Sequence, residues 1–176
     1  MPNYRRIRQL GGVYFFTVNL AKRNDNDLLT REIDALKRAI RTVRRDHPFG
    51  IHAWAVLPEH MHCMLELPGD ESSFATRWRL MKSNFSRSIT NQPALAPSCR
   101  QRGEKGIWQR RFWEHLITDD EDFRRHADYV HFNPVKHALV KQVADWPHST
   151  FHRWVDLGLY PKDWAGGQES ALDYDD

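Results

Sequence analysis

Cysteine is scarce in this chain of 176 residues, which contains only Cys63 and Cys99. Because these two lie far apart without CxxC spacing, neither a disulfide framework nor a zinc ribbon is predicted, and Cys63 is expected to be a buried thiol. Long apolar runs are missing too, since none approaches the ~18 residues that a membrane span requires. Residues 1–6 also lack the apolar core of a signal peptide. The sequence therefore predicts a soluble, cytoplasmic protein.

Acidic residues are almost absent from the middle of the chain. Residues 77–111 contain nine Lys or Arg against a single acid, Glu104, whereas the formal net charge of the whole chain is only +3. The C-terminal end has the opposite character, because no Lys or Arg follows Lys162. A basic body with an acidic tail indicates a polyanionic partner, most simply nucleic acid, and the alternative is an ordinary solvated surface.

The length and the hydrophobic content of 40% fit one domain with a real core. We expect this domain to span residues 1–164. The acidic stretch 165–176 contains glycine and is predicted to be a mobile tail.

The hydrophobic pattern predicts strands and helices in the order β-α-β-β-α-β. The expected strands are residues 13–20, 51–57, 60–67 and 107–117, and the expected helices are 30–46 and 73–88. This order is typical of a ferredoxin-like split βαβ fold of the α+β class. It predicts a four-stranded antiparallel sheet with helices on one face and an open opposite face. A further helix is expected to begin near Thr118 and to end near Asn133, because Pro134 disfavours helical geometry at the residue before it.

Two histidines lie one residue apart in the third predicted strand. Alternate side chains of a strand share one face, so His60 and His62 are expected to lie with Glu66 on the open face. Two neighbouring imidazoles supply half of a divalent metal site. On these residues alone, the alternative is a pair of ordinary surface histidines.

The C-terminal helix brings a second polar pair together. Tyr129 and Asn133 are four residues apart, so their side chains reach the same neighbourhood. Tyr129 could instead be an interfacial helix residue, and Asn133 could merely cap the helix before Pro134. His126 and His131 are expected to be structural, since His131 is turned from Tyr129 by roughly 200° around the helix axis.

Two sequence blocks carry a resemblance to a known family. The first is Pro58-Glu59-His60-Met61-His62, and the second is Tyr129-Val130-His131-Phe132-Asn133-Pro134-Val135-Lys136-His137. Together they resemble the REP-associated tyrosine transposases, relatives of the single-tyrosine HUH transposases of the insertion-sequence type, where HUH denotes His, hydrophobic, His. The likeness covers residues 4 to about 164 in the family's order. HxH alone is a weak signal, but it becomes specific when YxxxNP follows a ferredoxin-like pattern.

The resemblance implies a metal-dependent DNA endonuclease and strand transferase. Tyr129 would be the nucleophile that forms a 5'-phosphotyrosine link and frees a 3'-hydroxyl. His60, His62 and Asn133 would hold Mg²⁺ or Mn²⁺. The chemistry agrees, because an unreactive phosphodiester needs an electrophile at its non-bridging oxygens and an aligned nucleophile. Two rivals stay open: a non-catalytic binder of hairpin DNA, and a metal nuclease that uses water.

The resemblance also implies a DNA partner, namely single-stranded or hairpin DNA at repetitive extragenic palindromes (REP). Basic side chains on such a substrate would contact phosphates mainly. The candidates are Arg5, Arg6, Arg8, Arg77, Arg79, Lys82, Arg110 and Arg111. Trp54, Trp108 and Trp113 are expected to pack in the protein rather than to stack on bases. A monomer is favoured because the link from Ile117 to the Tyr129 helix is short, although insertion-sequence relatives share their sites between two subunits.

Overall fold

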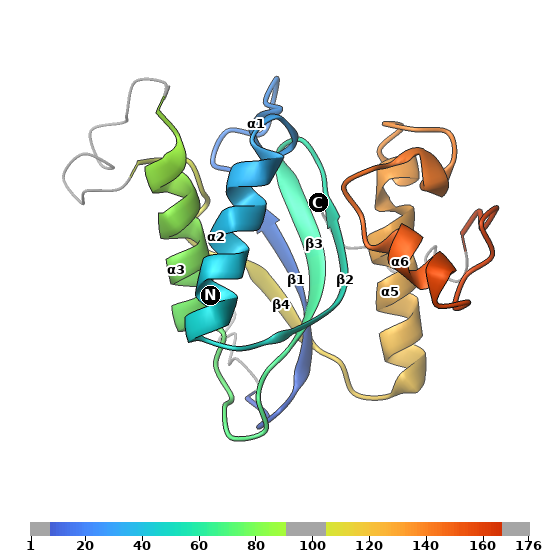
Figure 1. Cartoon of the computed structure of the whole chain (residues 1–176), viewed down its shortest axis with the longest axis horizontal. Coiled ribbons are helices and arrows are strands. Elements are labelled where there is room, and N and C mark those ends of the chain that lie inside the picture. The colour runs from blue at the N-terminus through green and yellow to red at the C-terminus, as the bar shows by residue number, and fades with distance from the viewer. Residues whose placement is uncertain (1–7, 91–104, 167–176) are drawn as a thin grey trace, which may run out of the picture.

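The structure is a computed structural model that describes residues 8–90 and 105–166. It contains a four-stranded antiparallel sheet in the order β2-β3-β1-β4 (Figure 1). The strands are β1 (Val13–Asn19), β2 (Gly50–Val56), β3 (His60–Glu66) and β4 (Trp113–Leu116). With two helical crossovers, this order confirms the predicted ferredoxin-like α+β fold.

The register of the two central strands places the histidines at one end of the sheet. β1 pairs with β3 from Val13 opposite Glu66 to Asn19 opposite His60. β2 and β3 are antiparallel and form a hairpin around residues 57–59. β4 is shorter than predicted, and Trp108 forms only an isolated bridge with Leu20. Residues 109–112 belong to no strand and separate the bridge at Trp108 from β4.

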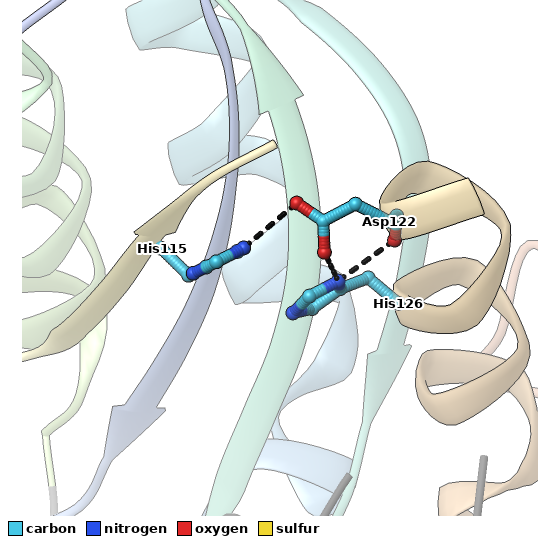
Figure 2. Close-up of side chains that lie close together, drawn as sticks. All are labelled: His115, Asp122 and His126. Atoms are coloured by element: carbon cyan, nitrogen blue, oxygen red, sulfur yellow. Dashed lines mark hydrogen bonds and ion pairs between the residues drawn. The ribbon is translucent and has the colours of Figure 1, made fainter. Parts of the chain in front are cut away.

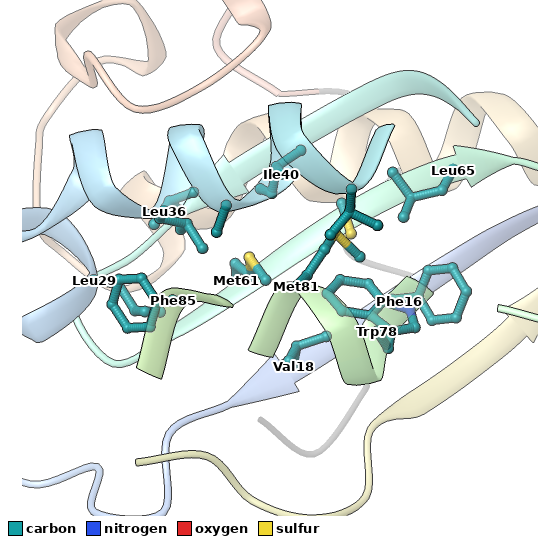
Figure 3. Close-up of a cluster of buried hydrophobic side chains, with 14 of the residues drawn as sticks. Phe16, Val18, Leu29, Leu36, Ile40, Met61, Leu65, Trp78, Met81 and Phe85 are labelled. Carbon is teal, nitrogen blue, oxygen red and sulfur yellow. The ribbon is translucent and has the colours of Figure 1, made fainter. Parts of the chain in front are cut away.

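Helices α2 (Ile33–Asp46) and α3 (Ala75–Ser88) cover one face of the sheet. Apolar side chains from both helices meet the β1 and β3 side chains that point to this face, and they form the main core (Figure 3). Its members include Phe16, Val18, Ile40, Met61, Leu65, Trp78 and Met81. Cys63 belongs to the same core, so the predicted buried thiol is confirmed, and burial raises its pKa.

The helix predicted to start at Thr30 is divided into two pieces. A single turn, α1 (Leu28–Arg31), precedes α2, and the two are separated at Glu32. The Thr30 hydroxyl donates to the carbonyl of Asp27 instead of capping α2. The apolar stripe of α2 nevertheless lies where the 3.6-residue period predicts.

The opposite face of the sheet is not open, which corrects the expectation from the sequence. Helix α5 (Asp120–Lys136) lies across it, on the side away from α2 and α3 (Figure 1). Ala127 and Val130 of α5 pack with Ala53 and Ala55 of β2 in a second apolar cluster. The small alanine side chains let the helix approach the strands closely. The histidines therefore lie between the sheet and a helix.

Helix α5 begins close to the predicted residue but ends beyond the predicted one. Asp119 caps the start as predicted, accepting a 2.8 Å hydrogen bond from the amide of Asp122. The predicted end at Asn133 is wrong, because the helix continues through Pro134 to Lys136. A proline so near the end removes one helical hydrogen bond, which the packing of this buried segment tolerates.

A short C-terminal region follows. It contains the 3₁₀ turn η1 (Val143–Asp145) and helix α6 (Phe151–Asp156). In the described ranges, no helix is long and apolar enough to cross a membrane. The division into a domain of residues 1–164 and a tail stays a prediction, because the tail beyond residue 166 lies outside the described residues.

Candidate active site between the sheet and helix α5

The two motif histidines occupy the first and third positions of β3 and face α5. Both are fully buried, and their ring centroids lie 4.9 Å apart at an interplanar angle of 82°. The predicted sharing of one face is therefore present. The burial differs from the predicted surface position, because α5 covers this face.

Each histidine ring is oriented through its Nδ1 atom. Nδ1 of His62 lies 2.9 Å from the hydroxyl of Thr17, and Nδ1 of His60 lies 3.0 Å from Oε1 of Glu59. Such bonds at one nitrogen orient the other nitrogen toward a ligand. Nε2 of His60 is buried and has no hydrogen-bond partner among the described residues. A metal ion would therefore bind these rings through Nε2.

Glu59 remains ionised next to His60. Burial acts to raise the pKa of Glu59, but the hydrogen bond and charge interaction with His60, a backbone hydrogen bond and the hydrogen bond from Arg23 together outweigh it, so that the pKa is lowered to about 2. Arg23 lies 3.4 Å from the same carboxylate. An ionised carboxylate accepts a hydrogen bond from Nδ1–H of His60, which leaves the Nε2 lone pair for a ligand. Glu66, which was expected on the same face as the two histidines, lies with its Oε2 atom 2.9 Å from Nε2 of His52.

Helix α5 places Tyr129 and Asn133 against the histidines. Tyr129 is 1% exposed, and its ring centroid lies 5.2 Å from that of His62. Asn133 is fully buried one turn later, and His137, a further turn on, lies 5.0 Å from His60 between ring centroids. Helix α5 thus runs alongside the histidine pair, with Tyr129 near His62 and the Asn133–His137 end near His60.

The side chain of Asn133 has an unsatisfied amide. Both Oδ1 and Nδ2 are buried without a hydrogen-bond partner in the part of the chain that the structure describes. Burying such a group without compensation costs on the order of 1–3 kcal/mol. An amide that only capped the helix would be satisfied by backbone groups. The oxygen of Asn133 and Nε2 of His60, both buried without a hydrogen-bond partner among the described residues, are donor types that a divalent cation accepts.

Two further residues shape the surroundings of Tyr129. Phe15 lies between the strands and the helix, with ring centroids 5.7 Å from His62 and 5.8 Å from Tyr129. Nζ of Lys136 lies 4.9 Å from the centroid of the Tyr129 ring. Neither was predicted to lie near Tyr129, although Lys136 belongs to the second sequence block. Thr17 was missed as well, because only the strand register places it opposite His62.

A second cluster of ionisable side chains joins β4 to the start of α5 (Figure 2). The Asp122 carboxylate lies 2.8 Å from Nε2 of His115 and 2.9 Å from Nδ1 of His126, and it accepts from the amide of Thr118 at 3.0 Å. Burial acts to raise the pKa of Asp122, but the hydrogen bonds from His115 and Thr118 outweigh it, so the pKa lies below its usual value. Burial lowers the pKa of His126.

The ligand atoms of His115, Asp122 and His126 lie within 4.8 Å of one another, close enough for a metal ion. Their present arrangement is a hydrogen-bonded bridge instead. Nδ1 of His126 also lies 2.8 Å from the backbone carbonyl of Asp122, and the two imidazoles stack at 4.6 Å. The bridge ties β4 to the first turn of the helix that carries Tyr129, which agrees with the structural role expected for His126.

His131 lies on the far side of α5, as predicted. Its Nε2 atom is 2.9 Å from the Thr150 hydroxyl, and its ring contacts Trp154 and Tyr160. Burial lowers the pKa of His131 to about 3. This histidine packs the C-terminal region onto α5 and does not face the candidate site.

The basic residues proposed from the sequence lie in different environments. Arg8, Arg79, Arg110 and Arg111 are exposed, and Lys82 is half-buried. Arg5 and Arg6 fall outside the described residues.

Arg77 is a correction, since its side chain is buried. Its guanidinium donates to the carbonyl of Pro48 at 2.8 Å and to Glu71 at 2.9 Å. These bonds brace the loop before α3, so we remove Arg77 from the set of phosphate-binding candidates.

Comparisons with known proteins identify relatives that match nearly the whole chain. No family model matches the chain. The REP-associated tyrosine transposase of Escherichia coli K12 is 51% identical over 166 residues, which cover 94% of this chain and 92% of that protein. A Haemophilus influenzae protein is 42% identical over 173 residues, 98% of each chain. A solved structure of the REP-associated tyrosine transposase bound to a REP hairpin has a TM-score of 0.82 at 49% identity, covering 99% of this chain and 95% of the other.

Proposed function

Because this chain belongs to the REP-associated tyrosine transposases, we propose that it is a metal-dependent DNA endonuclease and strand transferase. Its substrate is single-stranded or hairpin DNA at repetitive extragenic palindromes, and its intermediate is a 5'-phosphotyrosine on Tyr129. One observation carries the proposal: Tyr129 and Asn133 of α5 and the two β3 histidines are all buried, and the ring of Tyr129 lies 5.2 Å from that of His62 between centroids. These are the residues that a metal-assisted phosphoryl transfer by tyrosine needs.

His60, His62 and Asn133 are the residues that hold the metal in this proposal. The donor set of two imidazoles and an amide, completed by substrate oxygens, accepts Mg²⁺ or Mn²⁺. When bound, the ion polarises the non-bridging phosphate oxygens. Thr17 and Glu59 keep both rings in the orientation that this site requires, through their bonds to Nδ1.

The protein's own contribution to the chemistry centres on Tyr129. Its hydroxyl oxygen attacks phosphorus, forming the Oη–P bond while the P–O3' bond breaks. The phenol proton leaves the tyrosine, and the departing 3' oxygen ends as a free hydroxyl. Phe15 fixes the ring of Tyr129, and the ammonium of Lys136 near the ring favours negative charge on it. The phosphotyrosine ester conserves the energy of the phosphodiester, so a second 3'-hydroxyl reseals the strand without ATP.

The proposed partner is a REP hairpin, as in the related structure that is bound to one. A single subunit is sufficient in this proposal, because Tyr129 and His62 of the same chain are in ring contact at 5.2 Å between centroids. This contact supports the monomer favoured from the short link between β4 and α5.

The test is a search for the covalent intermediate. The protein is incubated with a labelled REP hairpin that carries a single-stranded extension, in Mg²⁺ or Mn²⁺, and denatured samples are examined for a protein–DNA adduct. Tyr129→Phe is expected to abolish the adduct and to keep hairpin binding. A wild-type protein that binds without cutting would be a non-catalytic binder. Cutting without an adduct, retained in Tyr129→Phe, would identify a nuclease that uses water.

A further inference from the structure

A basic cavity lies on the other side of the sheet, between α3 and the segment that leads to β4. Its volume is about 910 Å³. Among the described residues, five cationic side chains and no acidic one line it: Arg79, Lys82, Arg87, Lys105 and Arg110. We call this cavity the α3 groove. Its charge complements a polyanion, whereas the buried site around His60 contains the catalytic groups.

The wall of the α3 groove is aromatic as well as basic. Trp108 and Phe112 pack against the main core, as expected for Trp108, and their partly exposed rings also line the groove. Nζ of Lys82 lies 5.8 Å and 5.5 Å from the centroids of these rings. Lys82 also donates to the carbonyl of Gln109 at 2.8 Å, so this cation is held at a fixed place on the wall. Sites for single-stranded nucleic acid typically combine cationic side chains along the phosphate backbone with aromatic rings on which the bases stack.

The strand register connects this groove with the catalytic end of the sheet. The amide of Gln109 donates to the carbonyl of Asn19, and Trp108 bridges to Leu20. Asn19 is paired with His60 in the neighbouring strand. The wall of the groove therefore begins beside the end of β1 that lies next to the histidine pair, although α3 and α5 are on opposite faces (Figure 1).

We propose that the α3 groove binds the unpaired DNA strand next to the hairpin and leads it toward the histidine end of the sheet. This inference rests on the proposed function, since it assigns a place to part of that substrate. Unpaired bases fit better than a duplex stem, because bases within a duplex stack on one another and leave no face for Trp108. Arg79 and Arg87, both exposed on α3, contact the phosphates.

The first experiment uses a fluorescent oligothymidine, which forms no hairpin, and measures its affinity at several salt concentrations. Arg79→Gln/Arg87→Gln is expected to weaken binding roughly tenfold and to lower the salt slope by about 1.4, since each phosphate contact on a single strand contributes about 0.7. Arg41→Gln/Arg45→Gln removes the same charge from the exposed surface of α2 and is the matched control. Equal losses in the two double variants would overturn the proposal.

A second experiment locates the bases. An oligonucleotide containing 5-iododeoxyuridine is crosslinked to the wild-type protein by light, and the modified peptide is identified by mass spectrometry. Crosslinks to Trp108 or Phe112 support the groove, and crosslinks only to peptides outside the groove contradict it.

A blunt hairpin without extension separates the strand from the stem. If the groove variant loses affinity for the blunt hairpin as strongly as for oligothymidine, the groove binds the stem and the assignment to the unpaired strand is wrong. Failure of the proposed function is recognised separately, because it appears as a wild-type protein that forms no tyrosine adduct.

Discussion

The hydroxyl of Thr17 lies 2.9 Å from Nδ1 of His62, across the pairing of the two central strands. This bond sets the direction of the other ring nitrogen, although Thr17 belongs to neither sequence block. Thr17→Val removes the hydroxyl at nearly constant shape. Loss of such an outer bond to a ligand typically reduces metal affinity 10–100-fold. We expect a loss of this size for Mn²⁺, measured by calorimetry, with normal folding by circular dichroism.

The control for this experiment is Thr42→Val, at an exposed position of α2. It is expected to bind Mn²⁺ as the wild type does. Unchanged Mn²⁺ affinity in Thr17→Val would show that the Thr17 bond does not serve a metal site at His62.

The bridge between β4 and α5 predicts a pH-dependent contribution to stability. Asp122→Asn removes the carboxylate that binds His115 and His126, and we expect it to lower the free energy of unfolding by about 2 kcal/mol at pH 7. The pKa of Asp122 is lowered in the folded protein. Its stabilising effect is therefore present above the unfolded pKa of about 3.9 and is lost as the pH falls through the folded value.

Urea unfolding at neutral and acidic pH checks this prediction. The difference between wild type and Asp122→Asn should shrink as the pH falls below about 3.9. Asp120→Asn changes an exposed acid in the same helical turn and should cost less than about 1 kcal/mol. A difference that stays constant with pH would mean that the charge of Asp122 is not what stabilises the bridge.

Much of this arrangement could be predicted from local sequence pattern. Strand alternation placed His60 and His62 on one face, and helical spacing brought Tyr129 and Asn133 together. The order of the elements predicted the sheet. These features depend on periods of two and 3.6 residues, which the sequence displays directly.

The features that were missed depend on contacts between distant segments. A helix that follows four strands can pack on either face, so the sequence did not reveal that α5 covers the histidines. The alanines at positions 53 and 55 were a weak sign of it, since small side chains allow a close approach. The burial of Arg77 depends on the carbonyl of Pro48, 29 residues away. Neither the helical nor the strand period of the sequence can reveal a hydrogen bond between residues so far apart.

The lowered pKa of Lys82 leads to a prediction of how DNA affinity changes with pH. Burial lowers the pKa of this lysine to about 8. A lysine that shares the α3 groove with DNA phosphates therefore loses its charge above this pH, and the affinity for oligothymidine should fall between pH 7 and pH 9 at constant ionic strength. Lys82→Arg should retain its affinity over this range, because guanidinium stays protonated.

The control for the pH experiment is Arg79→Lys. A lysine at this exposed position should keep an ordinary pKa of about 10.4. The Arg79→Lys variant should therefore show the same pH dependence as the wild type. A Lys82→Arg variant that loses affinity between pH 7 and pH 9 as the wild type does would assign the titration to another group.

Substitution of Asn133 shows whether its amide is a metal ligand or a helix cap, because the two roles predict opposite effects on stability. Asn133→Leu replaces a buried amide that has no hydrogen-bond partner among the described residues. Without added metal, the variant is expected to be as stable as the wild type, or more stable by about 1 kcal/mol, because an uncompensated polar group leaves the interior. Mn²⁺ should raise the melting temperature of the wild type and leave that of the variant unchanged, as differential scanning fluorimetry would show. An amide whose role was to cap α5 would give the reverse result: Asn133→Leu would be less stable without metal, and Mn²⁺ would stabilise both proteins equally.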